Sequence, residues 1–182
     1  MRLFLALDLP EPTRAELLAW RERALEGRDD LRPLAPEALH VTLVFLGYLP
    51  EKKLEQTVTA AFEGIRDLSA PRLAVRDVRA VPPRDPRLFA FDLSDEGGDA
   101  TTLQAAASQA LAAARLYRPE KRPFWPHVTF ARVKRGQRRV PPVPGDDLPQ
   151  TPFAAAQVTL YRSHLSPRGA RYEPLERVNL AQ

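Results

Sequence analysis

The chain of 182 residues contains no cysteine, which excludes disulfide bonds, a thiolate nucleophile and cysteine-ligated metals together. No apolar run approaches the roughly 18 residues that a membrane-spanning helix requires. The N-terminal apolar run stops at Leu7, before Asp8 and Glu11, so we expect a strand there rather than a signal peptide. These absences predict a cytoplasmic protein that does not interact with membranes and whose chemistry uses oxygen and nitrogen side chains.

Lysine is also scarce, since only four of the 27 basic residues are lysines and the remainder are arginines. A formal net charge of +4 favours an anionic partner, and the planar guanidinium fork suits phosphate groups. Adaptation to heat is an equally good explanation, because 19 prolines and no cysteine fit a heat-tolerant host. Composition alone leaves both explanations open.

The chain has three histidines, and two of them open tetrapeptides of one pattern, His40-Val41-Thr42-Leu43 and His127-Val128-Thr129-Phe130. In a strand, residues i and i+2 point to the same side, so each motif places an imidazole and a hydroxyl together on one face. Strand propensity explains valine and threonine, but it does not explain why histidine precedes both. We therefore take the two motifs as candidate catalytic residues.

The motifs belong to a longer internal repeat. Residues 2–8 recur in outline as residues 87–92, and each copy is followed by a helical stretch and then by a His-x-Thr strand. The pattern predicts a single 182-residue unit whose copies, approximately 1–82 and 83–182, pack about a pseudo-two-fold axis. We expect an α+β fold of mainly antiparallel sheets with helices on their outer faces.

The remaining elements follow from hydrophobic periodicity and from the positions of proline and glycine. Helices are expected near 10–26, 50–64 and 97–117. Strands are expected near 2–8, 39–46, 72–80, 88–93, 126–134, 153–165 and 171–178. Loops are expected over 28–37 and 140–152, with a turn at Ser166-Pro167-Arg168-Gly169.

Opening of a cyclic phosphodiester by water would use all four motif side chains. One histidine takes the proton of the attacking water, and the other protonates the departing sugar oxygen. The hydroxyls of Thr42 and Thr129 donate hydrogen bonds to the phosphate oxygens. This chemistry requires neither a metal nor a cofactor, and the near-equivalence of the repeats leaves the acid and base roles unassigned.

Nearly the whole chain resembles the 2H phosphoesterases, and within them the bacterial and archaeal RNA 2′,3′-cyclic phosphodiesterases, also called 2′-5′ RNA ligases. The resemblance rests on both motifs, on residues 2–6 and 45–47, and on a tail that includes 160–165. It implies two lobes with a central cleft and an RNA substrate with a 2′,3′-cyclic phosphate end. It also implies a 2′-phosphate product, with His40 as proton donor and His127 as proton acceptor.

Two further residues are nucleotide-binding candidates. Trp125 lies two positions before His127, so alternation turns its indole to the catalytic face, where it would stack on a base or pack in the core. The resemblance suggests that Arg132 contacts the nucleotide, which requires a bulge or twist, because strict alternation points it away. We expect Phe45, at the corresponding offset from His40, in the core, and His164 to be structural or exposed.

Three alternatives compete with hydrolysis. The same histidines could join a cyclic phosphate end to a 5′-hydroxyl in a 2′-5′ linkage without ATP, and no Gly-x-x-x-x-Gly-Lys loop is present to bind ATP. The chain could hold RNA ends without cutting them. A zinc site is disfavoured because neither motif contains a carboxylate. We expect a monomer, because the two-fold symmetry is already internal.

Overall fold

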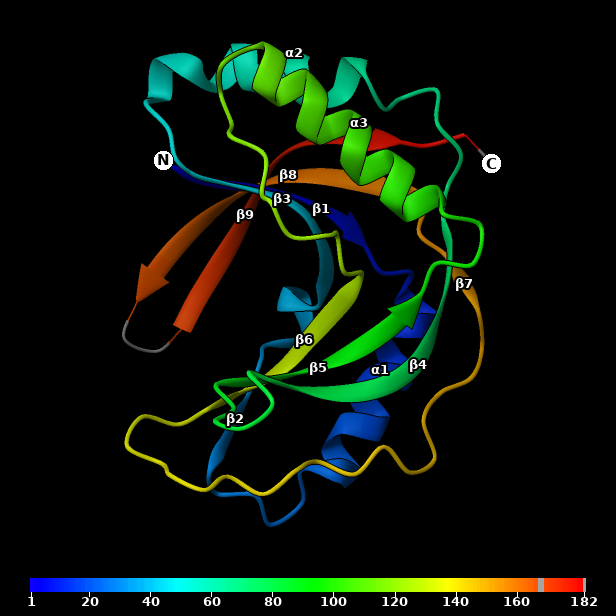
Figure 1. Cartoon of the computed structure of the whole chain (residues 1–182), viewed down its shortest axis with the longest axis vertical. Coiled ribbons are helices and arrows are strands. Elements are labelled where there is room, and N and C mark those ends of the chain that lie inside the picture. The colour runs from blue at the N-terminus through cyan, green and yellow to red at the C-terminus, as the bar shows by residue number, and fades with distance from the viewer. Residues whose placement is uncertain (167–168, 182) are drawn as a thin grey trace.

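A computed structural model describes residues 1–166 and 169–181 (Figure 1). It contains helices α1 (Glu11–Ala24), α2 (Leu54–Glu63) and α3 (Asp99–Ala113), with short 3-10 turns η1 (Pro36–Ala38) and η2 (Glu51–Lys53). Its strands are β1 (Arg2–Asp8), β2 (Leu31–Pro33), β3 (His40–Tyr48), β4 (Arg72–Val81), β5 (Leu88–Ser94), β6 (His127–Val133), β7 (Phe153–Ala154), β8 (Gln157–Ser166) and β9 (Gly169–Asn179). No helix of the described chain combines the length and apolar character needed to cross a membrane.

The strands form two antiparallel sheets, which confirms the expected α+β class. The first sheet has the order β3-β1-β8-β9 and the second has the order β2-β6-β5-β4-β7. Each sheet takes strands from both halves of the sequence, since β2 and β4 join the second sheet while β8 and β9 join the first. This exchange ties the two sheets together.

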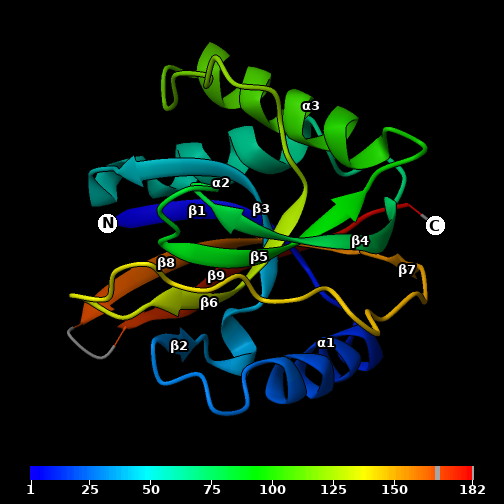
Figure 2. The same ribbon diagram turned by 60° about the horizontal axis from the view of Figure 1, so that its bottom comes forward.

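The helices lie on the outer sides of the two sheets. Helices α2 and α3 pack together on one side, with α3 against β3, and α1 lies at the opposite end of the molecule (Figures 1 and 2). Helix α1 begins after Pro10 with Pro12 in its first turn, and Gly27 adopts a left-handed φ of 72° just beyond its end. At the start of α3, the Asp95 carboxylate accepts hydrogen bonds from the backbone N–H groups of Ala100 and Thr101.

One continuous apolar cluster extends through both sheets and the helices. Strand β1 supplies five consecutive buried residues, as a strand covered on both faces should. On the second sheet, Trp20 of α1 meets Phe91 and Phe130 edge-on, with ring centroids 5.1 and 5.7 Å away. These three aromatic residues fasten α1 to the strand that carries the second motif.

Most of the expected elements are confirmed, and two differ. The single strand expected over 153–165 is two strands, β7 in the second sheet and β8 in the first, because the chain crosses between the sheets after Ala154. Residues 28–37, expected as a loop, contain the short strand β2, which pairs with β6, and the start of η1. A three-residue edge strand that begins with one buried leucine gives no periodic signal. The expected turn at Ser166-Pro167-Arg168-Gly169 includes Pro167 and Arg168, which lie outside the described residues, while Ser166 pairs with Gly169.

Replacing Phe130, which is fully buried beside Trp20 and Phe91, by alanine should lower the free energy of unfolding by about 3–5 kcal/mol. The loss combines apolar transfer with an unfilled cavity, and urea denaturation followed by circular dichroism measures it. Phe45→Ala is the matched control, because the Phe45 side chain is 42% exposed and should cost much less. Equal losses in the two variants would contradict this account of the core.

Candidate active site

Both His-x-Thr motifs lie on the wall of a single cleft of about 510 Å³. His40 and Thr42 reach it from β3 of the first sheet, and His127 and Thr129 reach it from β6 of the second. In each motif the residue after histidine is fully buried, whereas the histidine and threonine are only partly buried. The alternation expected from the sequence is therefore confirmed, and it brings the two motifs to one space.

The two motif strands pair with their neighbours in corresponding registers. In the first sheet Asp8 lies opposite His40, and in the second sheet Asp92 lies opposite His127. Two positions further on, an alanine of the neighbouring strand lies opposite each motif threonine. The sequence repeat is thus also a repeat of hydrogen-bond register.

A bulge follows each motif threonine. The pairing skips Leu43 in β3 and Phe130 in β6, so two consecutive residues point into the core in each strand. The bulge reverses the phase of alternation and turns the next side chains, Phe45 and Arg132, into the cleft. Arg132 therefore has the irregularity that its predicted nucleotide contact requires. The core position expected for Phe45 is wrong, because it was inferred from uninterrupted alternation.

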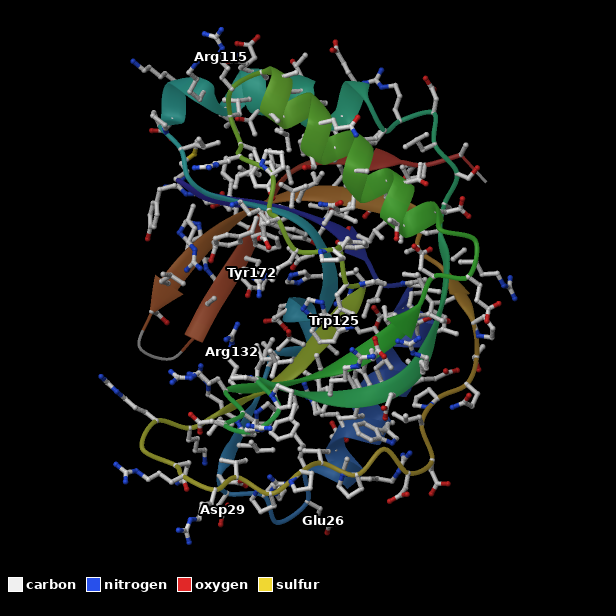
Figure 3. The ribbon with its side chains drawn as sticks, viewed as in Figure 1. Glu26, Asp29, Arg115, Trp125, Arg132 and Tyr172 are labelled. Atoms are coloured by element: carbon white, nitrogen blue, oxygen red, sulfur yellow. The ribbon has the colours of Figure 1, made fainter. Side chains whose placement is uncertain are left out.

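Several cleft residues were missed from the sequence because distant segments contribute them. Arg2 of β1 lies over the Phe45 ring, 4.8 Å from its centroid, and Arg32 comes from the unforeseen strand β2. Figure 3 shows Tyr172 of the first sheet and Arg132 of the second in the region between the sheets. Among the described residues that line the cleft, three are arginines and none is acidic, so the cleft favours an anionic ligand.

The His127 ring is oriented by the backbone carbonyl of the residue two positions before it. His127 Nδ1 lies 2.7 Å from the carbonyl oxygen of Trp125. A ring nitrogen that donates to a carbonyl must carry the proton, so the neutral His127 ring keeps a lone pair on Nε2. In the other motif, His40 Nε2 lies within hydrogen-bond distance of Thr42 Oγ1, 3.0 Å away.

Burial lowers the pKa of both imidazoles. The pKa of His40 falls from 6.5 to about 4, mainly because of desolvation, and the nearby positive charges of His127 and Arg14 lower it further. The pKa of His127 is also lowered by desolvation, while the backbone hydrogen bond to Trp125 and the charge of Asp92 partly oppose the shift. The two register-equivalent histidines therefore lie in different electrostatic surroundings.

The structure places Trp125 against His127 and outside the residues that line the cleft. Its indole stacks on the imidazole with ring centroids 4.1 Å apart and an angle of 12° between the planes. Its contact with a nucleobase stays a prediction. His164 is not among the residues that line the cleft, and its Nε2 lies 2.6 Å from Glu173 Oε2.

No metal-binding group is found among the described residues, in the sense of three or more histidine, aspartate or glutamate side chains gathered around one point. The absence of such a group holds for residues 1–166 and 169–181. The paired histidine and hydroxyl groups are the chemistry that the cleft presents.

Two antiparallel sheets that each carry a His-x-Thr motif to a shared cleft define a 2H phosphoesterase. Residues 7–89 match the family model described as LigT like Phosphoesterase. The RNA 2′,3′-cyclic phosphodiesterase of Thermus thermophilus is 36% identical over 186 residues, which cover 99% of this chain and 90% of that protein. The chain belongs to the LigT-like phosphoesterase family.

Solved structures agree with this assignment. The crystal structure of TT0787 of Thermus thermophilus has a TM-score of 0.83 and 32% identity, and the match covers 99% of this chain and 98% of that one. Escherichia coli LigT complexed with 3′-AMP has a TM-score of 0.79 and 27% identity, with 100% and 98% covered. Both matches extend over the two sheets.

The lowered pKa of His40 should make folding stability depend on pH. The folded state binds fewer protons than the unfolded state between pH 6.5 and about 4, so the free energy of unfolding decreases as the pH falls through this window. His40 alone contributes a slope of up to about 1.4 kcal/mol per pH unit. Urea titrations across this range should show a smaller slope in His40→Phe. An unchanged slope in this variant would contradict the assigned environment of His40.

Proposed function

We propose that this protein hydrolyses the 2′,3′-cyclic phosphodiester at RNA ends to a 2′-phosphomonoester by metal-independent acid–base catalysis. The observation that carries the proposal is the meeting of two His-x-Thr motifs in one cleft lined by arginines and no acidic side chain among the described residues. The names of the relatives support hydrolysis of the cyclic phosphodiester, and the 3′-AMP complex of the Escherichia coli protein supports binding of a nucleoside monophosphate.

In the proposed reaction a water molecule attacks phosphorus while one histidine accepts its proton. The bond between phosphorus and the 3′ oxygen breaks, and the second histidine protonates that oxygen as it leaves, so the phosphate stays on the 2′ oxygen. Following the resemblance, His127 is the acceptor and His40 the donor. The lone pair on His127 Nε2, which the hydrogen bond from Nδ1 to the backbone leaves available, suits an acceptor.

The threonines stabilise the charge that develops on the phosphate oxygens. The Thr42 hydroxyl, which lies 3.0 Å from His40 Nε2, donates to a phosphate oxygen when substrate binds. Thr129 occupies the equivalent position of the other motif. A bound phosphodiester anion also raises the pKa of the histidines, which allows one of them to hold the proton that the leaving oxygen needs.

Nucleotide contacts come from the positions that the two bulges turn into the cleft. Arg132 supplies a guanidinium to the phosphate or base, as the resemblance suggests, and Phe45 offers an exposed aromatic ring. Trp125 is a further candidate for base stacking, although its observed contacts are with His127 and Asp92.

We also propose that residues 1–182 act as one two-lobed unit with an internal repeat near 1–82 and 83–182, as a monomer in the cytoplasm. The continuous core and the exchange of strands between the sheets support a single unit.

A 2′,3′-cyclic-phosphate oligonucleotide incubated with the protein in EDTA should yield a 2′-phosphate end, identified by ³¹P NMR. Replacing His40 or His127 by alanine should reduce kcat by about 10²–10⁴-fold, because each variant loses its general acid or base. His164→Ala is the matched control and should retain activity, since the His164 side chain does not line the cleft and contacts Glu173 instead.

Each alternative function gives a different result in this assay. Loss of activity in EDTA, restored by a metal, would contradict the proposed mechanism. Tight binding of the RNA end without turnover in the wild type would replace hydrolysis by end binding. A 2′-5′ linked product with an added 5′-hydroxyl RNA would show ligation by the same two histidines.

The pH–rate profile should be bell-shaped, because one imidazole must be charged and the other neutral. The optimum of kcat/KM should lie below pH 6.5, since this parameter reports the free enzyme, in which both histidine pKa values are lowered. The optimum of kcat should lie higher, because bound phosphate favours the charged imidazole. A rate that is flat from about pH 5 to about pH 9 would contradict catalysis by paired histidines.

A further inference from the structure

Asp92 is a completely buried carboxylate at the centre of a hydrogen-bond network beside His127. Its Oδ2 accepts hydrogen bonds from Arg76 Nε and Nη2 at 3.0 and 2.7 Å and forms an ion pair with Arg79 Nη2 at 2.9 Å. Its Oδ1 accepts a hydrogen bond of 2.6 Å from Trp125 Nε1. A buried carboxylate held by two guanidinium groups and an indole N–H is fixed in place.

Trp125 connects this carboxylate to the imidazole of His127. Its carbonyl oxygen lies 2.7 Å from His127 Nδ1, and its indole stacks nearly parallel to the imidazole at 4.1 Å. The carbonyl therefore determines the tautomer of His127, and the stacked indole limits the rotation of the imidazole. The indole is itself held by Asp92 and by the guanidinium of Arg79, which lies over it at 5.6 Å.

The first sheet lacks this connection, although its register is equivalent. Asp8, opposite His40, accepts hydrogen bonds from the hydroxyls of Thr159 and Tyr161 at 2.6 and 2.7 Å. The residue two positions before His40 is Ala38, which has no ring to stack on the imidazole. The ring of His40 is stacked by Phe4 of the neighbouring strand instead. The link between carboxylate, indole and imidazole is therefore specific to His127.

We propose that Asp92 and Trp125 form a positioning unit for His127. The buried carboxylate fixes the indole, and the indole and the backbone carbonyl of Trp125 hold the imidazole with Nε2 toward the cleft. This inference rests on the proposed function for its consequence in catalysis. Under this proposal, different neighbouring residues hold the two repeated histidines in place. It also assigns Trp125 a role other than contact with a nucleobase.

The charged groups around His127 come from three strands. Asp92 belongs to β5, Arg76 and Arg79 belong to β4, and His40 belongs to β3. The carboxylate favours the charged form of His127, whereas a charged His40 opposes it. Removing the charge of Asp92 should therefore lower the pKa of His127 and leave two guanidinium groups without their partner.

Trp125→Phe and Asp92→Asn test the unit, with Tyr161→Phe as the matched control because it removes one hydrogen-bond donor from the equivalent Asp8. Long-range ¹H–¹⁵N NMR of the free, ¹⁵N-labelled protein reports the tautomer and titration of His127 without substrate. Trp125→Phe keeps the carbonyl but removes the Nε1–H that Asp92 holds, so residue 125 loses its fixed position and the preference of His127 for the Nδ1–H tautomer should weaken. Asp92→Asn should shift the titration of His127 to lower pH. Tyr161→Phe should leave the signals of His127 unchanged.

Kinetics with a 2′,3′-cyclic mononucleotide supply the second measurement. Both variants should lose about 10- to 100-fold in kcat, with KM within about twofold of wild type, because a misoriented base affects the chemical step. Unchanged His127 signals and unchanged kcat would overturn the proposal. A change in KM that depends on the base, with His127 unaffected, would overturn it in favour of nucleobase stacking.

The test still decides the proposal if one variant unfolds or if the proposed function is wrong. If Asp92→Asn unfolds, Trp125→Phe carries the test, because phenylalanine keeps an aromatic ring and the backbone carbonyl at position 125. If the wild type hydrolyses no cyclic phosphate, the proposed function fails, while the NMR comparison still decides whether the unit positions His127.

Discussion

The site depends on one constraint, the register of two antiparallel strand pairs. Pairing of β1 with β3 and of β5 with β6 places an aspartate opposite each motif histidine and a bulge after each motif threonine. A shift of one residue in either pair would turn its imidazole and hydroxyl into the core. Because one face of each motif strand is buried and the other lines the cleft, such a shift would expose apolar groups and bury polar ones, and the core therefore maintains the register.

The bulges extend this arrangement beyond the four motif side chains. Each adds one buried residue and then reverses the alternation, so the cleft also receives Phe45 from one sheet and Arg132 from the other. The same backbone device thus presents an aromatic ring on one wall and a guanidinium on the opposite wall. Strand β1 adds Arg2 beside the first motif, and β2, which the exchange of strands places in the second sheet, adds Arg32, so three arginines line the cleft.

Burial of the histidines lowers their pKa values. Desolvation disfavours their charged forms, and in the proposed reaction an anionic phosphate would favour the charged form again. The repeat makes the two histidines equivalent in sequence and in register. Their neighbours make them different, because Trp125 and the charged Asp92 support His127, while aromatic rings surround His40.

Much of the site was predictable from the sequence because its key signal is local. Two-residue periodicity together with a repeated rare histidine predicted both motifs, their strands and their meeting in one cleft. The place of Phe45 and the strand β2 could not be predicted in this way. A bulge leaves no mark in a run of apolar residues, and a three-residue edge strand forms only because β6 offers it unpaired backbone groups.

The sequence by itself determined which side chains are proposed to carry the chemistry and which face of each strand they share, since both follow from residue type and alternation along one segment. Only the tertiary structure decided what surrounds them. The partners of Asp92, the stacking of Trp125 on His127 and the arginines of the cleft join residues from several strands. Such contacts depend on how sheets pair and pack, which short-range periodicity does not encode.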